Sequence, residues 1–243
     1  MAQPPLPVLS EYWTRPEDRS AAVNALFDRS ARQYDRICAV ASFGAGKSYR
    51  RQALRRAGLH PGMAVLDVGT GTGQVAREAV RILGSGGRIV GIDPSAQMMG
   101  AGRRTLAIDM VQGVGEQLPF ADGTFDFVLM GYALRHVADL DQAFREYRRV
   151  LRPAGRVLLL EITRPASRLG AGLVRVYMRD LVPLLAYVST GSADARRLMR
   201  FYWDTIEHCV PPETVLQSLR RIGFNSVDRN VVGGLFSEYT AVK

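Results

Sequence analysis

Short apolar runs alternate with amphipathic stretches from about residue 63 to residue 162. The runs that we predict as strands are residues 64–68, 88–92, 107–112, 125–130 and 157–162. Between them, residues 74–83 carry apolar side chains at helical spacing, and a further helix is expected to begin at Asp139. Near-continuous apolar strands that alternate with helices are typical of a parallel sheet covered by helices on both faces.

The C-terminal residues have a different pattern. Residues 212–222 read as a helix, and residues 224–232 and 235–242 read as two strands separated by Gly233-Gly234. A glycine pair between two such strands predicts an antiparallel hairpin. We therefore expect an α/β fold with a seven-stranded, mostly parallel, doubly wound, Rossmann-like sheet that ends in an antiparallel hairpin.

Two segments fall outside this alternation. Residues 1–60 are expected to be a loose, Pro-rich arm of about 15 residues followed by helices that cover a cofactor site, with residues 18–40 helical. Residues 163–211 carry helical patterns at about 171–182 and 193–208. Because ligands bind outside the carboxyl ends of parallel strands, we expect this insertion to form a substrate lid. A helix that only packs on the core is the alternative. Residues 61–162 would then be the cofactor-binding core, and residues 212–243 would complete the sheet.

The charge is strongly positive and comes almost entirely from arginine. The formal net charge is +9, and only Lys47 and Lys243 are lysines. The arginines are scattered or lie on helix faces without a nucleic-acid-binding motif, so we expect solvated faces, no nucleic-acid partner and at most weak attraction to a membrane surface. Cys38 and Cys209 form no zinc pattern, and no apolar run is long enough to span a membrane. We expect a cytoplasmic protein that can lie peripherally at the inner membrane surface and can form a homodimer.

The clearest chemical signal is a glycine-rich loop after the first predicted strand, with the sequence VLDVGTGTG at residues 65–73. Part of it fits the dinucleotide fingerprint GxGxxA, which binds a pyrophosphate. Asp67, however, lies two residues before the first glycine, and a carboxylate there suits a cationic ligand such as S-adenosylmethionine (AdoMet). Asp93 ends the second strand, where a carboxylate can accept hydrogen bonds from ribose hydroxyls. Residues 44–48, GAGKS, mimic a phosphate-binding loop but lack its first glycine and a preceding strand.

Together these motifs resemble class I AdoMet-dependent methyltransferases. The resemblance rests on residues 65–73, on GIDPS with Met98-Met99, and on EQLPF followed by FDFV. ARQYD with SFG, then ALRHV and RVLRP, are similar to the UbiE-type family of ubiquinone/menaquinone-biosynthesis C-methyltransferases. The similarity covers roughly residues 25–162 well and the segment around Gly223-Phe224 more loosely.

The resemblance implies that AdoMet is the cofactor and S-adenosylhomocysteine the product. Asp67, Gly69 and Gly71 would hold the methionine moiety, Asp93 the ribose, and the neighbourhood of Met98 the adenine. The full set of expected cofactor-binding residues is Tyr34, Asp67, Gly69, Thr70, Gly71, Asp93, Pro94, Met98, Gly113, Val114, Gly115, Glu116 and Met130. At Val114-Gly115 the family usually has Asp-Ala, so the acid that would accept from the adenine amino group is missing.

Candidate acceptor-site residues follow the fourth strand or lie in the insertion. His136 is the first candidate for a catalytic base because histidine titrates near neutrality, and His208 is the second. Arg135 could stabilise a phenolate. Aromatic side chains expected to line the substrate pocket are Tyr132, Tyr177, Tyr202 and Trp203.

Three functions remain open at this point. The first is C-methylation of an aromatic or quinol ring after a phenolic proton is removed. The second is O- or C-methylation of a soluble aromatic or polyketide-like acceptor in specialised metabolism. The third is an NAD-binding oxidoreductase or a non-catalytic protein with the AdoMet-binding fold.

Overall fold

A computed structural model describes residues 9–243 and contains one seven-stranded sheet in the order β3-β2-β1-β4-β5-β7-β6. The strands are β1 (Ala64–Val68), β2 (Arg88–Asp93), β3 (Asp109–Gln112), β4 (Phe125–Gly131), β5 (Leu151–Ile162), β6 (Asn225–Val232) and β7 (Phe236–Val242). Strands β1 to β5 pair in parallel, whereas β7 is antiparallel to both of its neighbours. This confirms the fold class that the hydrophobic pattern predicts.

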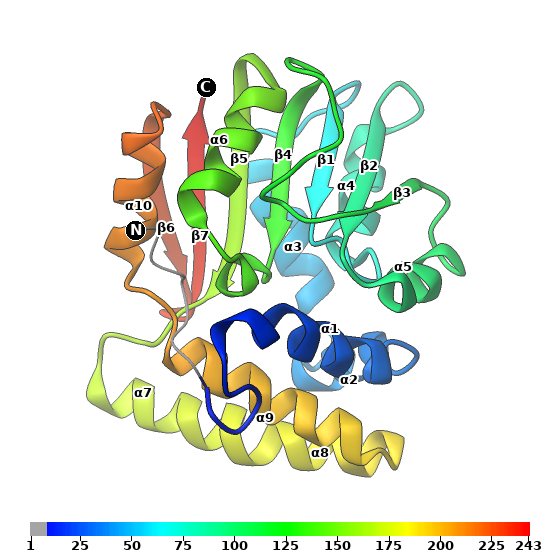
Figure 1. The fold of residues 1–243 in the computed structure, drawn as a ribbon, viewed down its shortest axis with the longest axis vertical. Helices are drawn as coiled ribbons and strands as arrows, with labels where there is room; N and C mark the ends of the chain where they lie inside the picture. Colours follow the sequence, from blue (N-terminus) through cyan, green and yellow to red (C-terminus); the bar gives the residue numbers. More distant parts are fainter. Residues whose placement is uncertain (1–8) are drawn as a thin grey trace.

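Helices cover both faces of the sheet (Figure 1). They are α3 (Gly46–Arg56), α4 (Gln74–Leu83), α5 (Ala96–Arg103), α6 (Leu140–Val150) and α10 (Pro212–Arg221). Consecutive strand residues point to opposite faces, so Val65 packs with α3 and α4 while Leu66 packs with α6 and α10. The helix start expected at Asp139 is confirmed, since its side chain caps α6, and Ser95 caps α5 in the same way.

A further helical layer lies across the carboxyl ends of β1, β4 and β5 (Figure 1). It consists of η1 (Pro16–Asp18), α1 (Arg19–Ser30), α2 (Tyr34–Ala41), α7 (Arg168–Arg175), η3 (Val176–Leu181), α8 (Val182–Thr190) and α9 (Ala193–Glu207), while the short η2 (Leu134–His136) follows β4. This layer has its own apolar core, which includes Ile37, Leu198 and Trp203. Residues 19–41 and 168–207, far apart in sequence, thus form one unit.

The structure corrects three expectations for this layer. The N-terminal arm is not loose between residues 9 and 15, because Trp13 is buried and packs edge-on against Phe201; residues 1–8 lie outside the described part of the chain. The helix expected over residues 18–40 is broken at residues 31–33. The first helix of the insertion runs from residue 168 to residue 190 and contains a π-helical stretch, η3, just before Pro183. Pro183 has no backbone N–H to donate to the preceding turn, which favours such a widened segment.

Among the helices between residues 9 and 243, none is both long and apolar enough to cross a membrane.

Candidate active site

The glycine-rich loop forms a sharp turn from β1 into α4. Gly69, Gly71 and Gly73 all have positive φ, between +54° and +79°, which L side chains rarely adopt. A Cβ atom at Gly69 would lie 2.7 Å from the Cβ of Ala133, so a side chain does not fit there. These glycines therefore keep the backbone of the loop open to a ligand.

Asp67 presents one unsatisfied carboxylate oxygen at the end of β1. Its Oδ2 accepts a hydrogen bond from the Thr70 hydroxyl at 2.7 Å, whereas Oδ1 is buried and has no partner among the described residues. Burial raises the pKa of Asp67 to about 7. The hydrogen bond from Thr70 lowers this pKa, whereas the negative charge of Asp93 raises it further. A buried carboxylate with an unused oxygen fits an ammonium group, which would supply both the missing hydrogen bond and the opposite charge.

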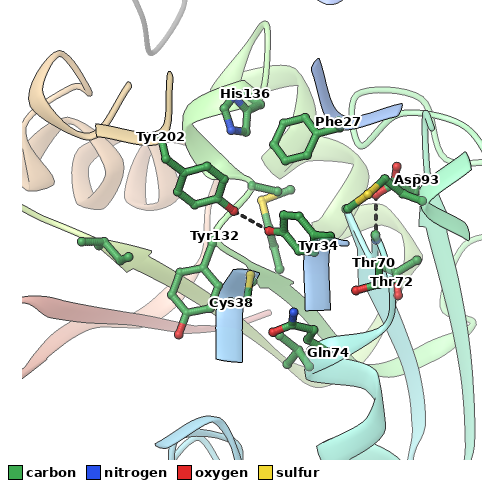
Figure 2. A pocket seen from close by; sticks show the side chains of 18 of the residues that line it. Phe27, Tyr34, Cys38, Thr70, Thr72, Gln74, Asp93, Tyr132, His136 and Tyr202 are labelled. Atoms are coloured by element: carbon green, nitrogen blue, oxygen red, sulfur yellow. Dashed lines mark hydrogen bonds between the residues drawn. The ribbon is translucent and has the colours of Figure 1, made fainter. Parts of the chain in front are cut away.

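Asp93 lies at the end of the neighbouring strand β2 and is held by backbone donors. Its Oδ2 accepts from the Gly71 amide at 2.8 Å (Figure 2), and its Oδ1 accepts from the Ser95 amide at 2.8 Å. Burial raises its pKa to about 6, although both amides act in the opposite direction. Each carboxylate oxygen keeps a further lone pair, so the pair of oxygens can accept from the two hydroxyls of a ribose.

Asp35 fixes helix α2 against the glycine-rich loop. Its carboxylate accepts hydrogen bonds from the Thr72 hydroxyl, the Gln74 amide and the Arg77 guanidinium. Helix α2 is thereby held over the loop, and this places the Tyr34 side chain in the cavity described next.

A continuous cavity of about 560 Å³ lies between the sheet and the helical layer. Every residue that we expected to bind AdoMet lines it, including Asp67, Asp93, Met98 and Tyr34. Val114 lines the cavity as well and is 44% exposed, so the cavity reaches the surface beside it. The unpartnered Asp67 oxygen, the open glycine backbone and the Asp93 carboxylate fit the ammonium group and the ribose of AdoMet.

The other half of the cavity is mainly aromatic. Figure 2 shows Tyr34 and Tyr202 pointing toward each other, with Phe27 and His136 alongside. The hydroxyl oxygens of Tyr34 and Tyr202 lie 2.5 Å apart, and burial raises the pKa of both tyrosines. Since only one hydroxyl of such a pair donates to the other, the second keeps a proton for another acceptor.

His136 lines this half and is held between aromatic rings. It stacks on Phe201, with ring centroids 5.5 Å apart, and meets the edge of Phe27 at the same distance. Both of its ring nitrogens are buried and lack a partner among the described residues. Burial, together with the positive charges of Arg135 and Arg19, lowers the pKa of His136 well below its ordinary value. The ring is therefore neutral at physiological pH.

The other predicted acceptor-site residues divide into two groups. Tyr132 and Tyr177 line the cavity together with Tyr202, whereas Trp203 is buried in the core of the helical layer. His208 does not reach the cavity: it lies exposed beyond the end of α9, with Nδ1 against the Asp204 carbonyl.

Arg135 also lies outside the cavity, buried behind Tyr202. Its guanidinium pairs with Glu161 of β5, donates to the Thr205 hydroxyl of α9, and stacks on the Tyr202 ring with 4.4 Å between the guanidinium carbon and the ring centroid. Its ion pair is thus buried, and the guanidinium does not reach the cavity as expected for a group that contacts a phenolate. The structure gives it contacts that position Tyr202 and α9.

Several cavity residues were missed from sequence. Phe27, Met199 and Phe236 read as ordinary core positions, and Cys38 carried no motif. Burial raises the pKa of the Cys38 thiol to about 11, so it contributes a neutral wall. Nothing in the local sequence distinguishes an apolar side chain that faces a cavity from one that faces a core.

The fold recurs in solved methyltransferases. A SAM-dependent methyltransferase from Thermotoga maritima superposes with a TM-score of 0.64 and 22% identity, over 90% of this chain and 99% of that one. One from Aquifex aeolicus gives a TM-score of 0.59 and 18% identity, over 79% of this chain and 88% of that one. At these identities the likeness concerns the fold.

Sequence relatives give a closer match. The ubiquinone/menaquinone biosynthesis C-methyltransferase UbiE of Hahella chejuensis is 31% identical over 234 residues, 93% of each chain. The protein of the same name from Pseudomonas paraeruginosa is 32% identical over 241 residues, 96% of this chain and 93% of that one. The family model of the ubiE/COQ5 methyltransferases matches residues 15–243.

These matches, with the site geometry, decide between an AdoMet enzyme and an NAD oxidoreductase. The protein is an AdoMet-dependent methyltransferase, and the chain belongs to the ubiE/COQ5 methyltransferase family.

Proposed function

We propose that the methyl acceptor is a hydroxylated aromatic ring of the quinol type, and that the methyl group is transferred to a ring carbon. The observation that carries this proposal is the aromatic half of the cavity. There Phe27, Tyr34 and Tyr202 lie around His136, whose two ring nitrogens find no hydrogen-bond partner within residues 9–243. A flat ring fits between aromatic side chains, and its hydroxyl would satisfy the buried imidazole. The printed names of the relatives from Hahella chejuensis and Pseudomonas paraeruginosa support the same acceptor class.

The residues of the first half would hold AdoMet. Asp67 would accept from its ammonium group, Asp93 from its ribose hydroxyls, and Met98 would pack beside its adenine. Bound AdoMet supplies an electrophilic methyl group on a sulfonium. The aromatic half lies in the same cavity, so the protein holds both ligands together and the helical layer excludes water from them.

His136 would act on the acceptor hydroxyl. A neutral imidazole offers one ring nitrogen as a hydrogen-bond acceptor. That nitrogen can accept the hydroxyl proton, which increases the electron density on the ortho carbon of the acceptor ring. Burial, with the positive charges of Arg135 and Arg19, lowers the pKa of His136 and makes it a weak base, yet the same two charges also favour a phenolate oxygen nearby. Positive charge and imidazole would thus share the work of generating the nucleophilic ring.

The proposal is tested by product analysis with methyl-labelled AdoMet and two soluble acceptors, a short-chain demethylated quinol and a matched monophenol without the second hydroxyl. We expect label on a ring carbon of the quinol, identified by NMR. Label on oxygen would instead establish an O-methyltransferase. If neither acceptor is labelled while S-adenosylhomocysteine binds normally, the quinol assignment is wrong.

A further inference from the structure

We propose that the outer face of the helix formed by α7, η3 and α8 docks on the surface of a bilayer that contains anionic lipid. The acceptor half of the cavity would then open at that surface. This helix is the element of the helical layer farthest from the sheet (Figure 1), so its outer face is accessible.

The first observation is a stripe of exposed apolar side chains along this helix. The stripe consists of Leu169, Leu173, Val176, Leu184 and Val188, each between 51% and 78% exposed. Their spacing of three, four or eight residues places them on one helix face, which only Asp180 interrupts. Opposite them, Ala171, Met178, Val182 and Ala186 are buried. Most exposed large apolar side chains of residues 9–243 belong to this one helix, and such concentration marks an interaction surface.

The second observation is the charge beside the stripe. Arg168, Arg175 and Arg179 are exposed and follow one another at helical spacing. Between Arg164 and Arg200 the chain has seven arginines and two acidic residues, Asp180 and Asp194. An apolar face bordered by arginines is the pattern of a helix that lies in a membrane interface, with its charges at the lipid headgroups.

The same charge argues against a second copy of the chain as the occupant. A twofold interface would bring the arginine rows of two molecules together, and the like charges would oppose association. An anionic bilayer supplies the opposite charge along the whole stripe. A bilayer also needs no shape complementarity to the helix.

The position of the stripe links it to the cavity. Phe43, in the turn between α2 and α3, lines the cavity and is 78% exposed, so the cavity reaches the surface there. Its ring lies 6.2 Å from that of Tyr177 in η3, which also lines the cavity and donates a hydrogen bond to the Ala41 carbonyl. The cavity opening therefore adjoins the helix that carries the stripe. That a lipid-borne acceptor enters here rests on the function proposed above, whereas docking itself does not.

The test is flotation of the full-length protein with vesicles of neutral phosphatidylcholine or of phosphatidylcholine with phosphatidylglycerol. We expect the anionic vesicles to bind the protein and the neutral vesicles to bind it at least tenfold more weakly. The triple variant Leu173→Gln, Leu184→Gln, Val188→Gln removes apolar surface without changing charge, and none of its positions lines the cavity. The double variant Arg168→Gln, Arg175→Gln removes charge. Both should weaken binding at least tenfold.

Two control variants change surface residues away from the stripe. Val231→Gln changes an exposed apolar residue on β6, and the double variant Arg55→Gln, Arg104→Gln removes the same charge from α3 and from the residue after α5. Controls should bind vesicles like the wild type. The proposal is wrong if the wild type does not bind anionic vesicles, if controls and stripe variants behave alike, or if ultracentrifugation shows a dimer that the stripe variants dissociate.

Different results would contradict the docking surface and the quinol acceptor. Vesicle binding is measured without methyl transfer, and the stripe variants should keep the wild-type affinity for S-adenosylhomocysteine and the wild-type unfolding temperature. Loss of vesicle binding with intact methylation of a soluble quinol would leave the proposed function standing. Vesicle binding without methylation of any quinol would leave the docking surface standing.

Discussion

At the scale of single residues, Asp67 carries a cost in stability. Its carboxyl is buried with one oxygen unpartnered in the described part of the chain, and burial raises its pKa to about 7. In the unfolded chain the same group has a pKa near 4. Folding therefore favours the protonated carboxyl. Its contribution to the free energy of unfolding is complete below the pKa of the unfolded chain and is lost as the pH rises through the folded pKa, about 7.

The variant Asp67→Asn separates stability from binding. At pH 8 we expect the free energy of unfolding of the ligand-free protein to rise by about 1–2 kcal/mol, because no buried charge remains. Affinity for S-adenosylhomocysteine should fall at least tenfold, since the ammonium group loses its counter-charge. Chemical denaturation and calorimetry measure the two effects. Unchanged affinity would exclude Asp67 from the binding site.

Wild-type affinity should depend on pH through the same groups. A cationic ligand binds the ionised form of Asp67, so affinity should decrease as the pH falls from 8 to 6, with a further decrease near the pKa of Asp93, about 6. Titration calorimetry in buffers of different ionisation enthalpy should detect proton release on binding near pH 7. In Asp67→Asn the release near pH 7 should disappear.

Val114 gives a gain-of-affinity prediction. It lines the cavity at the position where the family usually has an acid, and it is 44% exposed, so an aspartate there needs no burial of charge. We expect Val114→Asp to raise affinity for S-adenosylhomocysteine about threefold to tenfold, by accepting from the adenine amino group. Val114→Asn, of the same size without the charge, is the matched control and should gain less. A loss of affinity in Val114→Asp would show that the adenine lies elsewhere.

His136 should affect turnover and not cofactor binding. We expect His136→Phe to lower kcat at least 100-fold with unchanged affinity for S-adenosylhomocysteine, while His136→Asn, which keeps a hydrogen-bond acceptor, retains part of the activity. Because the pKa of His136 lies well below 6.5, wild-type kcat at saturating AdoMet should stay level between pH 8 and pH 6. A kcat that falls with an apparent pKa near 6.5 would contradict the neutral ring.

At the scale of elements, one buried ion pair connects the helical layer to the sheet. Arg135 follows β4, pairs with Glu161 of β5 and donates to Thr205 of α9. Both side chains of the pair are almost completely buried, so neither charge can be solvated if the other is removed. The geometry of α9, and hence of Tyr202, depends on this contact.

Replacing one residue of the Arg135–Glu161 pair should destabilise the protein more than replacing both. We expect Arg135→Met to lower the free energy of unfolding by about 3–5 kcal/mol because Glu161 is left unpaired, and the double variant with Glu161→Gln to regain at least half of that loss. Urea unfolding of the wild type, the two single variants and the double variant completes a double-mutant cycle, which measures the coupling energy. If the losses simply add, the pair carries no coupling.

At the scale of the whole molecule, the cavity is formed by two layers that are distant in sequence. The sheet supplies Asp67 and Asp93, and the helical layer supplies Phe27, Tyr34 and Tyr202. A ligand between the layers binds only the folded state and should stabilise it by about 2.7 kcal/mol at a hundredfold excess over Kd. The unfolding temperature should accordingly rise by about 5–10 °C with S-adenosylhomocysteine and not with NAD at the same concentration, in a thermal scan.

The sequence by itself determined the sheet and the cofactor half of the site. The alternation of apolar strands with helices predicts all seven strands, although β5 begins at Leu151 and not at residue 157, because the polar and turn-forming residues 152–156 hide the start of the strand. Asp67, the glycines and Asp93 lie at or just after strand ends, at spacings that local backbone geometry sets. These features depend on neighbouring residues, so they can be read along the chain. The bounds of α4, Gln74–Leu83, coincide with the predicted helix for this reason.

Only the tertiary structure decided the acceptor half. Arg135 and His136 are adjacent in the chain, yet one is buried in an ion pair and the other faces the cavity. His208 and Tyr202 share a predicted helix. In the structure α9 ends at Glu207, so Tyr202 lines the cavity while His208 lies exposed beyond the helix end. Which face of α9 or α2 meets the cavity depends on packing between segments about 170 residues apart, such as those of Tyr34 and Tyr202. Such long-range packing leaves no local pattern, because an apolar side chain has the same hydropathy whether it faces a substrate, a core or a lipid surface.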